Sequence, residues 1–277
     1  MEDLSILEIV NLLTVGITSY NIKQHIPSDV STHNQFIPAE NLQSQKWLNQ
    51  IDEWTDAQKM MINTKKTKSM IFNFTENFQF DTRLKIKDQN IDLIDSTKLL
   101  GTVISNDLKW DMNTKEIVKK ANSRMQLLRK CASFGPSVGD LQEIYVLFVR
   151  SILEQSATVW HSSISVENSS DLERVQKSAL RIILGDRYPG YQQGLIRLGM
   201  ETLKSRREML CINFAKKCVK SDKLKHMFPE NPEDQNMKTR KYEKYKVQFA
   251  NTGRCQKSPI IYMQKLLNED HLQNKIK

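Results

Sequence analysis

The sequence lacks most of the features by which membrane proteins, secreted proteins and common enzyme classes are identified. Its 277 residues contain no apolar run near the roughly 20 residues that a membrane helix requires, and its acidic start, Met1-Glu2-Asp3-Leu4, has no basic signal-peptide segment. The nine glycines are scattered, so no phosphate-binding or dinucleotide-binding loop can be assembled, and no Ser/His/Asp triad is recognisable. We expect an intracellular protein, in the nucleus or the cytoplasm.

Cysteine is scarce, and the positions of the cysteines argue against a structural metal site. The four cysteines form no CxxC pair and no zinc-finger spacing. They are Cys131, Cys211, Cys218 and Cys255. Buried or free thiols in a reducing compartment are therefore expected.

Positive charge is abundant, but it is unevenly distributed. Residues 1–110 carry 11 Lys and Arg against 14 Asp and Glu, a net −3. Residues 111–220 carry 18 against 11, or +7, and residues 221–277 carry 12 against 7, or +5. An excess confined to the second half predicts a polyanionic partner there, although many basic proteins never bind nucleic acid.

The first 110 residues show helical spacing once and short apolar runs afterwards. A helix is expected from Ala39, because apolar residues recur at helical spacing as far as Trp54. Residues 69–74 favour a strand, residues 78–94 a hairpin that turns at 88–90, and residues 97–105 one further strand. We expect residues 60–74 and 97–105 to belong to one antiparallel sheet.

After Trp110 the apolar residues follow the three-four spacing of helices. Four stripes predict helices over residues 117–132, 141–160, 172–183 and 203–218, the first ended by Gly135-Pro136 and the third by Gly185. Short connections between successive helices favour a bundle. Residues 221–277 are polar and basic, and predict a loosely ordered tail with one short helix near 260–267.

Two groups of lysine and arginine side chains are candidates for binding phosphate. The turn Asn63-Thr64-Lys65-Lys66-Thr67-Lys68 lies between two apolar runs, so its lysines are expected at the end of a sheet. The second group lies on the polar faces of two predicted helices and consists of Lys120 and Arg124, with the adjacent Lys119, and of Arg174, Lys177 and Arg181. The ordinary alternative is a hairpin with solvated lysines for the first group and a solvated helix face for the second.

The lysine-rich turn and the segments after it resemble one protein family. Residues 63–68 are similar to the Asn-x-x-Lys-Thr-Lys segment in the palm of reverse transcriptases from non-LTR (LINE-like) retrotransposons. Residues 97–105, with Lys98-Leu99-Leu100-Gly101, resemble the following primer-grip strand, and Asp107-Leu108-Lys109-Trp110 resembles the entry into the thumb.

Downstream segments continue the resemblance in the same order. Residues 153–161, residues 172–179 and residues 203–211 are similar to the helical region that follows the polymerase core. The resemblance therefore covers the chain from about residue 1 to about residue 220. It implies an α+β fold, in which a small antiparallel palm-remnant sheet (1–110) precedes a mostly helical thumb and connection bundle (111–220) and the basic tail (221–277).

The resemblance also locates the chemistry. The family's catalytic turn reads aromatic-x-Asp-Asp-Leu, and Met1-Glu2-Asp3-Leu4 aligns with its end. It implies that Asp3 stands for the second aspartate and a Mg²⁺ ligand, that Glu2 replaces the first, and that Lys66 lies beside the triphosphate. Nucleotide addition needs two metal ions held by carboxylates from more than one motif. The upstream motif with the other aspartate has no counterpart here.

These observations predict a truncated RNA-directed DNA polymerase that is inactive alone and retains contacts with an RNA template and a DNA primer. Lys65, Lys68, Lys120, Arg124, Arg174, Lys177 and Arg181 are the expected nucleic-acid contacts. One alternative is a chain that completes a polymerase site together with a separate palm. Another is a helical nucleic-acid-binding or interaction module without polymerase ancestry, which a structure without a sheet joining residues 61–74 to residues 99–104 would favour.

Overall fold

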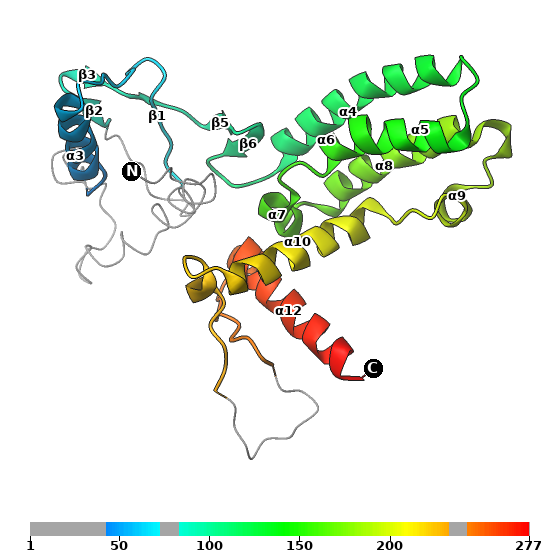
Figure 1. Ribbon diagram of the computed structural model, residues 1–277. Coiled ribbons are helices and arrows are strands. Elements are labelled where there is room, and N and C mark those ends of the chain that lie inside the picture. Colours follow the sequence, from blue (N-terminus) through cyan, green and yellow to red (C-terminus); the bar gives the residue numbers. More distant parts are fainter. Residues whose placement is uncertain (1–42, 73–82, 233–242, 277) are drawn as a thin grey trace. The chain divides into compact units, whose positions relative to one another are not determined.

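Figure 1 shows the computed structural model, which describes residues 43–72, 83–232 and 243–276. The chain is α+β and mostly helical, as the sequence predicts. It divides into two compact units, Met1–Lys109 and Trp110–Lys277. Within the described ranges, no helix is both long enough and apolar enough to span a membrane.

The first unit contains one described helix, α3 (Gln43–Ala57), which is tied to a strand by a buried glutamine. Gln45 accepts a hydrogen bond from Lys85 N at 2.9 Å and donates one to Lys85 O at 2.7 Å. The Gln45 side chain thereby makes the two hydrogen bonds that a neighbouring strand would make with the backbone of Lys85. Without Gln45 these backbone groups would be unpaired on that side. The apolar stripe of α3, formed by Trp47, Ile51 and Trp54, is about half exposed.

The strands of this unit form two-stranded pairs. β1 (Lys68–Ser69) is parallel to β4 (Asp92–Leu93), β2 (Lys85–Ile86) is antiparallel to β3 (Gln89–Asn90), and β5 (Ser96–Leu99) is antiparallel to β6 (Thr102–Ser105). The prediction of one antiparallel sheet joining 60–74 to 97–105 is therefore wrong for the residues described here. The hairpin expected within 78–94 is present as β2 and β3, but it turns at Lys87 and Asp88.

Residues 97–105 form a hairpin instead of the predicted single strand. Leu100 (φ +47°) and Gly101 (φ +87°) both have positive φ, and the register joins Leu99 to Thr102. Two successive residues with positive φ give the tight turn that matches the twist of paired strands. The apolar residues occur as two short runs, Leu99-Leu100 and Val103-Ile104, which a single strand could also contain, so the apolar pattern does not reveal the turn.

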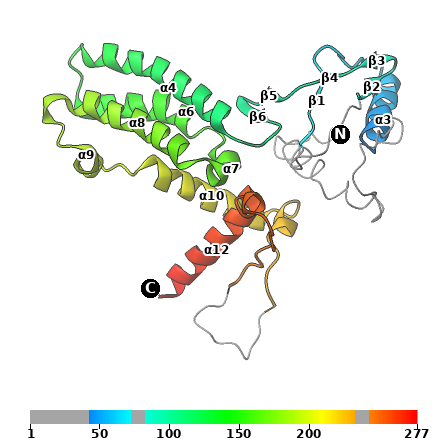
Figure 2. The same ribbon diagram turned by 180° about the vertical axis from the view of Figure 1, so that it is seen from behind.

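The second unit is a helical bundle built around α4 (Asp111–Ala132) and α8 (Val166–Leu184), which lie side by side in both views (Figures 1 and 2). Their facing stripes are fully buried, with Ala121, Met125 and Leu128 on α4 and Leu172, Ala179 and Leu180 on α8. Both helices match the prediction, and Gly185, with φ +54°, follows the end of α8.

The helix predicted over 141–160 is interrupted. It runs as α5 (Val138–Ile144), a π-helical segment η2 (Tyr145–Arg150) and α6 (Ser151–Leu153). The chain then breaks at Ser156, whose φ is +53°, before the short helix α7 (Ala157–Trp160) and the 3-10 turn η3 (His161–Ser163). A serine in this left-handed conformation ends one helix axis and begins another, although no glycine or proline marks the place.

The rest of the bundle consists of shorter turns and two long helices. The 3-10 turn η4 (Gly185–Arg187) leads to α9 (Tyr191–Arg197), which was not predicted, and α10 (Leu203–Lys220) follows as expected. The remaining elements are η5 (Lys225–Met227), α11 (Gly253–Gln256) and α12 (Pro259–Ile276). The helix expected near 260–267 is thus longer than predicted, and it packs on α10 instead of being loosely ordered.

Two buried amides of α12 hold an extended segment against it. Asn268 accepts a hydrogen bond from Tyr245 N at 2.8 Å and donates one to Tyr245 O at 2.9 Å. Gln264 donates to Met227 O at 2.8 Å and accepts from Gln248 N at 3.1 Å. These bonds satisfy backbone groups that would otherwise be buried without partners.

Candidate nucleic-acid interface

The lysine-rich turn in the first unit is stabilised by its own backbone. Asn63 O accepts from the N–H groups of Lys66 and Thr67 at 3.0 Å each, and Thr64 donates to Gln89 at 2.6 Å. Lys65 and Lys66 are exposed. Lys68, in contrast, pairs with Asp92 on the neighbouring strand, so part of its charge is neutralised within the unit.

The proposed metal-binding turn, Glu2 and Asp3, lies outside the described residues. Within the ranges that are described, no group of three or more His, Cys, Asp or Glu side chains is arranged to hold a metal ion.

The solvent face of α8 carries the predicted triad of basic residues. Arg174, Lys177 and Arg181 are all exposed on the side opposite the buried stripe. Arg174 pairs with Asp171 at 2.9 Å, and Arg181 lies over the ring of Tyr188, 5.7 Å from its centroid. Glu167 is also exposed on this helix. The face is therefore mixed in sign.

The solvent face of α4 is more uniformly basic. Residues 117–132 contain five Lys and Arg and no acid. Four of them are exposed, namely Lys119, Arg124, Arg129 and Lys130. The fifth, Lys120, is half-buried and lies 3.6 Å from Glu116, one turn earlier. Lys119, Arg129 and Lys130, together with Lys115, which is exposed near the start of α4, lie within about 100° of one another around the helix and are here called the α4 basic face. Lys120 and Arg124 lie further round the helix.

A further group of arginines at the end of α8 was missed by the sequence analysis. Arg187 and Arg197 are exposed, and Arg197 donates to Arg187 O at 3.2 Å, which brings α9 close to the turn after α8. Together with Arg181 on Tyr188 they gather three guanidinium groups at this end of the bundle. Their spacing in the sequence carries no helical pattern, because η4 and α9 are separate short elements.

Behind the α8 face, a buried polar network sets the position of that helix. Tyr145 donates to Gln176 at 2.7 Å, and Gln176 donates to Tyr191 at 3.0 Å and to Glu201 O at 2.9 Å. Tyr191 in turn donates to Glu173. Burial and the adjacent Glu173 carboxylate raise the pKa of Tyr191. The hydroxyl therefore stays protonated and continues to donate.

A second buried group joins α8, α10 and α12, the last through Tyr262, whose hydroxyl lies 3.5 Å from His161 Nε2. Arg207 is fully buried and donates to His161 Nδ1 at 3.2 Å and to Ser169 Oγ at 3.0 Å, and its guanidinium lies over the ring of Trp160. Burial, with Arg207 nearby, lowers the pKa of His161 to about 4. The neutral imidazole can therefore accept from Arg207 at physiological pH. Because these groups are enclosed, they do not face a ligand.

Comparison of the chain with protein-family models, curated proteins and solved structures finds no match.

Proposed function

We propose that the chain binds the phosphate backbone of nucleic acid, without sequence preference, through the α4 basic face. The observation that supports this proposal best is the run from 117 to 132, in which five cations occur without an intervening acid on a helix whose other side is buried. Cations fixed on a rigid helix displace the counterions condensed on a nucleic acid, and this release drives association. The exposed face of α8, which carries charges of both signs, contributes less to the binding of nucleic acid.

The experiment is a titration of labelled RNA–DNA duplex at several salt concentrations. Each phosphate contact adds roughly 0.7–0.9 to the slope of log affinity against log salt. Replacing Lys115, Lys119 and Lys130 with Ala should lower the slope by about two to three, whereas replacing Arg174, Lys177 and Arg181 should lower it less, because Arg174 is already paired. The control removes three exposed lysines elsewhere in the unit, Lys204, Lys246 and Lys265. Equal slopes for the α4 and control variants would refute the proposal.

The resemblance to non-LTR reverse transcriptases makes an RNA template paired with a DNA primer the proposed ligand. On this proposal the chain does not add nucleotides, since by the resemblance Glu2 stands in place of one aspartate of the catalytic turn. The test is primer extension with Mg²⁺ and deoxynucleotides, by the chain alone and after addition of a separate palm. If the chain alone extends the primer, and if Asp3→Ala abolishes this extension, the proposal that the chain does not add nucleotides is contradicted.

The second candidate is a helical nucleic-acid-binding module without polymerase ancestry. The strand pairing supports this candidate, because β1 pairs with β4 and β5 with β6, and no described pairing joins 61–74 to 99–104. Both candidates share the α4 basic face. They differ in ligand, since only the first predicts a preference for RNA–DNA hybrid over DNA duplex of the same length.

A further inference from the structure

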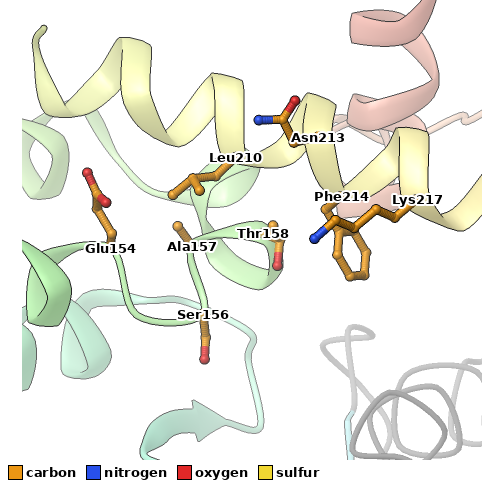
Figure 3. A pocket seen from close by; sticks show the side chains of 8 residues that line it. All are labelled: Glu154, Ser156, Ala157, Thr158, Leu210, Asn213, Phe214 and Lys217. Carbon is orange, nitrogen blue, oxygen red and sulfur yellow. The ribbon is translucent and has the colours of Figure 1, made fainter.

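A shallow groove between α7 and α10 lies apart from the α4 basic face. Its volume is about 250 Å³, smaller than the roughly 300–1,000 Å³ of pockets that enclose a whole small molecule. It is lined by Glu154, Ser156, Ala157, Thr158, Leu210, Asn213, Phe214 and Lys217 (Figure 3). A groove of this size suits one unit of an extended chain more than an enclosed ligand.

The floor of the groove is apolar, whereas its rim offers unused polar groups. Leu210 and Phe214 of α10 are only partly buried. Ser156, Thr158 and Asn213 make no side-chain hydrogen bond to any residue in the described part of the chain. In the view of Figure 3 the amino group of Lys217 points from α10 toward Thr158. A ligand could therefore be held by apolar contact below and by hydrogen bonds from the rim.

The two ends of the groove differ in charge. At one end the Glu154 carboxylate lines the groove, where Arg206 binds it through both Nε and Nη2 and Arg150 Nε lies 3.8 Å away, so its charge is neutralised within the unit. At the other end Lys217 is exposed and has no ion pair with a described residue. The groove therefore offers one available cation beside an apolar floor.

We propose that this groove binds single-stranded nucleic acid, with one base on Leu210 and Phe214 and the adjacent phosphate at Lys217. An aromatic ring beside an unpaired cation is the combination of stacking and basic contact by which proteins hold single strands. The inference rests on the proposed function, since it assumes a nucleic-acid ligand. It adds a second site, specific for unpaired strands.

The test compares two labelled single strands of about ten nucleotides, within the site sizes known for such proteins. One is oligoadenylate, and the other has the same sugar-phosphate backbone without bases. The wild-type chain should bind oligoadenylate about tenfold more tightly, which corresponds to the stacking of one base. Leu210→Gln keeps a good helix former but makes the floor polar, and should bring the ratio of the two affinities near one.

Lys217→Ala should weaken the binding of both strands and should lower the slope of log affinity against log salt by about 0.7. Lys220→Ala is the matched control, because Lys220 is exposed on the same helix but does not line the groove. Circular dichroism verifies that each variant is folded. A wild-type ratio near one, or a ratio unchanged by Leu210→Gln, overturns the proposal. Displacement of oligoadenylate by oligoglutamate of equal charge also overturns it, in favour of an acidic peptide ligand.

The two proposals fail separately. Suppose that the triple substitution on α4 leaves the salt slope unchanged while Leu210→Gln abolishes the preference for bases. The proposal that the groove binds single strands is then supported, and the proposal that the α4 basic face binds phosphate is refuted. The reverse pattern refutes the groove alone. Absence of binding to either strand refutes the groove outright, whereas the α4 basic face is then judged on the duplex titration.

Discussion

Among single residues, Arg207 is the cation most completely removed from water in the described part of the bundle. Its side chain is fully buried, Nη1 has no hydrogen-bond partner, and no described carboxylate lies within ion-pair distance. Burying a charge costs free energy that one imidazole and one hydroxyl offset only in part. Arg207 therefore occupies volume in the core at an electrostatic cost.

Two substitutions separate volume from charge at this position. Arg207→Met keeps most of the volume and removes the charge, so its free energy of unfolding should lie within about 1 kcal/mol of the wild type. Arg207→Ala leaves a cavity beside Trp160 and should cost about 3 kcal/mol. Urea denaturation followed by circular dichroism measures both values. Equal losses for Met and Ala would mean that the hydrogen bonds to His161 and Ser169 dominate.

His161 makes the stability of the bundle depend on pH. Burial and the nearby Arg207 lower its pKa to about 4, from 6.5 in the unfolded chain. As the pH falls below 6.5 the unfolded chain takes up a proton that the folded chain does not, so stability that is complete above pH 6.5 is lost progressively down to pH 4. Between pH 6.5 and 5 the wild type should lose about 2 kcal/mol more than His161→Gln.

The measurement is urea unfolding at a series of pH values in that window. His226→Gln is the control, because His226 is exposed on η5. A pH dependence that persists in His161→Gln and disappears in His226→Gln would contradict the assignment. A loss of stability that begins only below pH 4 would contradict the lowered pKa.

At the scale of elements, α12 fixes the extended segment around Tyr245 through Asn268. Asn268→Ala removes two hydrogen bonds and leaves the N–H and C=O of Tyr245 unpaired. The free energy required to open this segment should therefore fall by about 2 kcal/mol. Trypsin cleavage after Lys244 and Lys246 should then accelerate about thirtyfold, since it follows the population of the open form. Gln273→Ala, exposed on the same helix, should leave the rate unchanged.

Which elements could be predicted follows from how much each depends on distant residues. α4, α8 and α10 carry complete apolar stripes, and their sequence positions were predicted well. The break at Ser156 and the turn at Leu100-Gly101 depend on single residues with positive φ, which periodicity does not detect. β1 spans two residues and pairs with a strand more than twenty positions away, so its partner could not be chosen from local pattern.

In the candidate interface, too, some features follow from local sequence pattern and others depend on distant residues. Exposure of Arg174, Lys177 and Arg181 follows from helical spacing alone, whereas the pairing of Arg174 with Asp171 depends on side-chain geometry. Arg206 and Arg207 are neighbours with identical chemistry, yet one binds Glu154 and the other is enclosed. Only the packing of α10 against its neighbours distinguishes them. The groove beside Lys217 likewise exists only once α7 and α10 are together.

For the whole molecule, the division into two units separates the charge. Trp110–Lys277 contains 30 Lys and Arg against 18 Asp and Glu, a net +12, whereas Met1–Lys109 is at −3. Residues 110–277 produced alone should bind RNA–DNA duplex with the same salt slope as the full chain, because the basic faces all lie in that unit. A filter-binding titration compares the two. A slope lower by one or more in the shorter chain would assign phosphate contacts to Lys65 and Lys66.

The contact between Tyr262 and His161 has a consequence for the time course of synthesis. These residues lie 101 positions apart, and Ser163 donates to Lys257 O across 94 positions. At the usual 5–20 residues per second, about 5–20 s elapse on the ribosome between translation of His161 and of its partner. During this interval η3 and the adjacent α7 lack the contacts that α12 provides. Slower translation of residues 164–262 lengthens this interval.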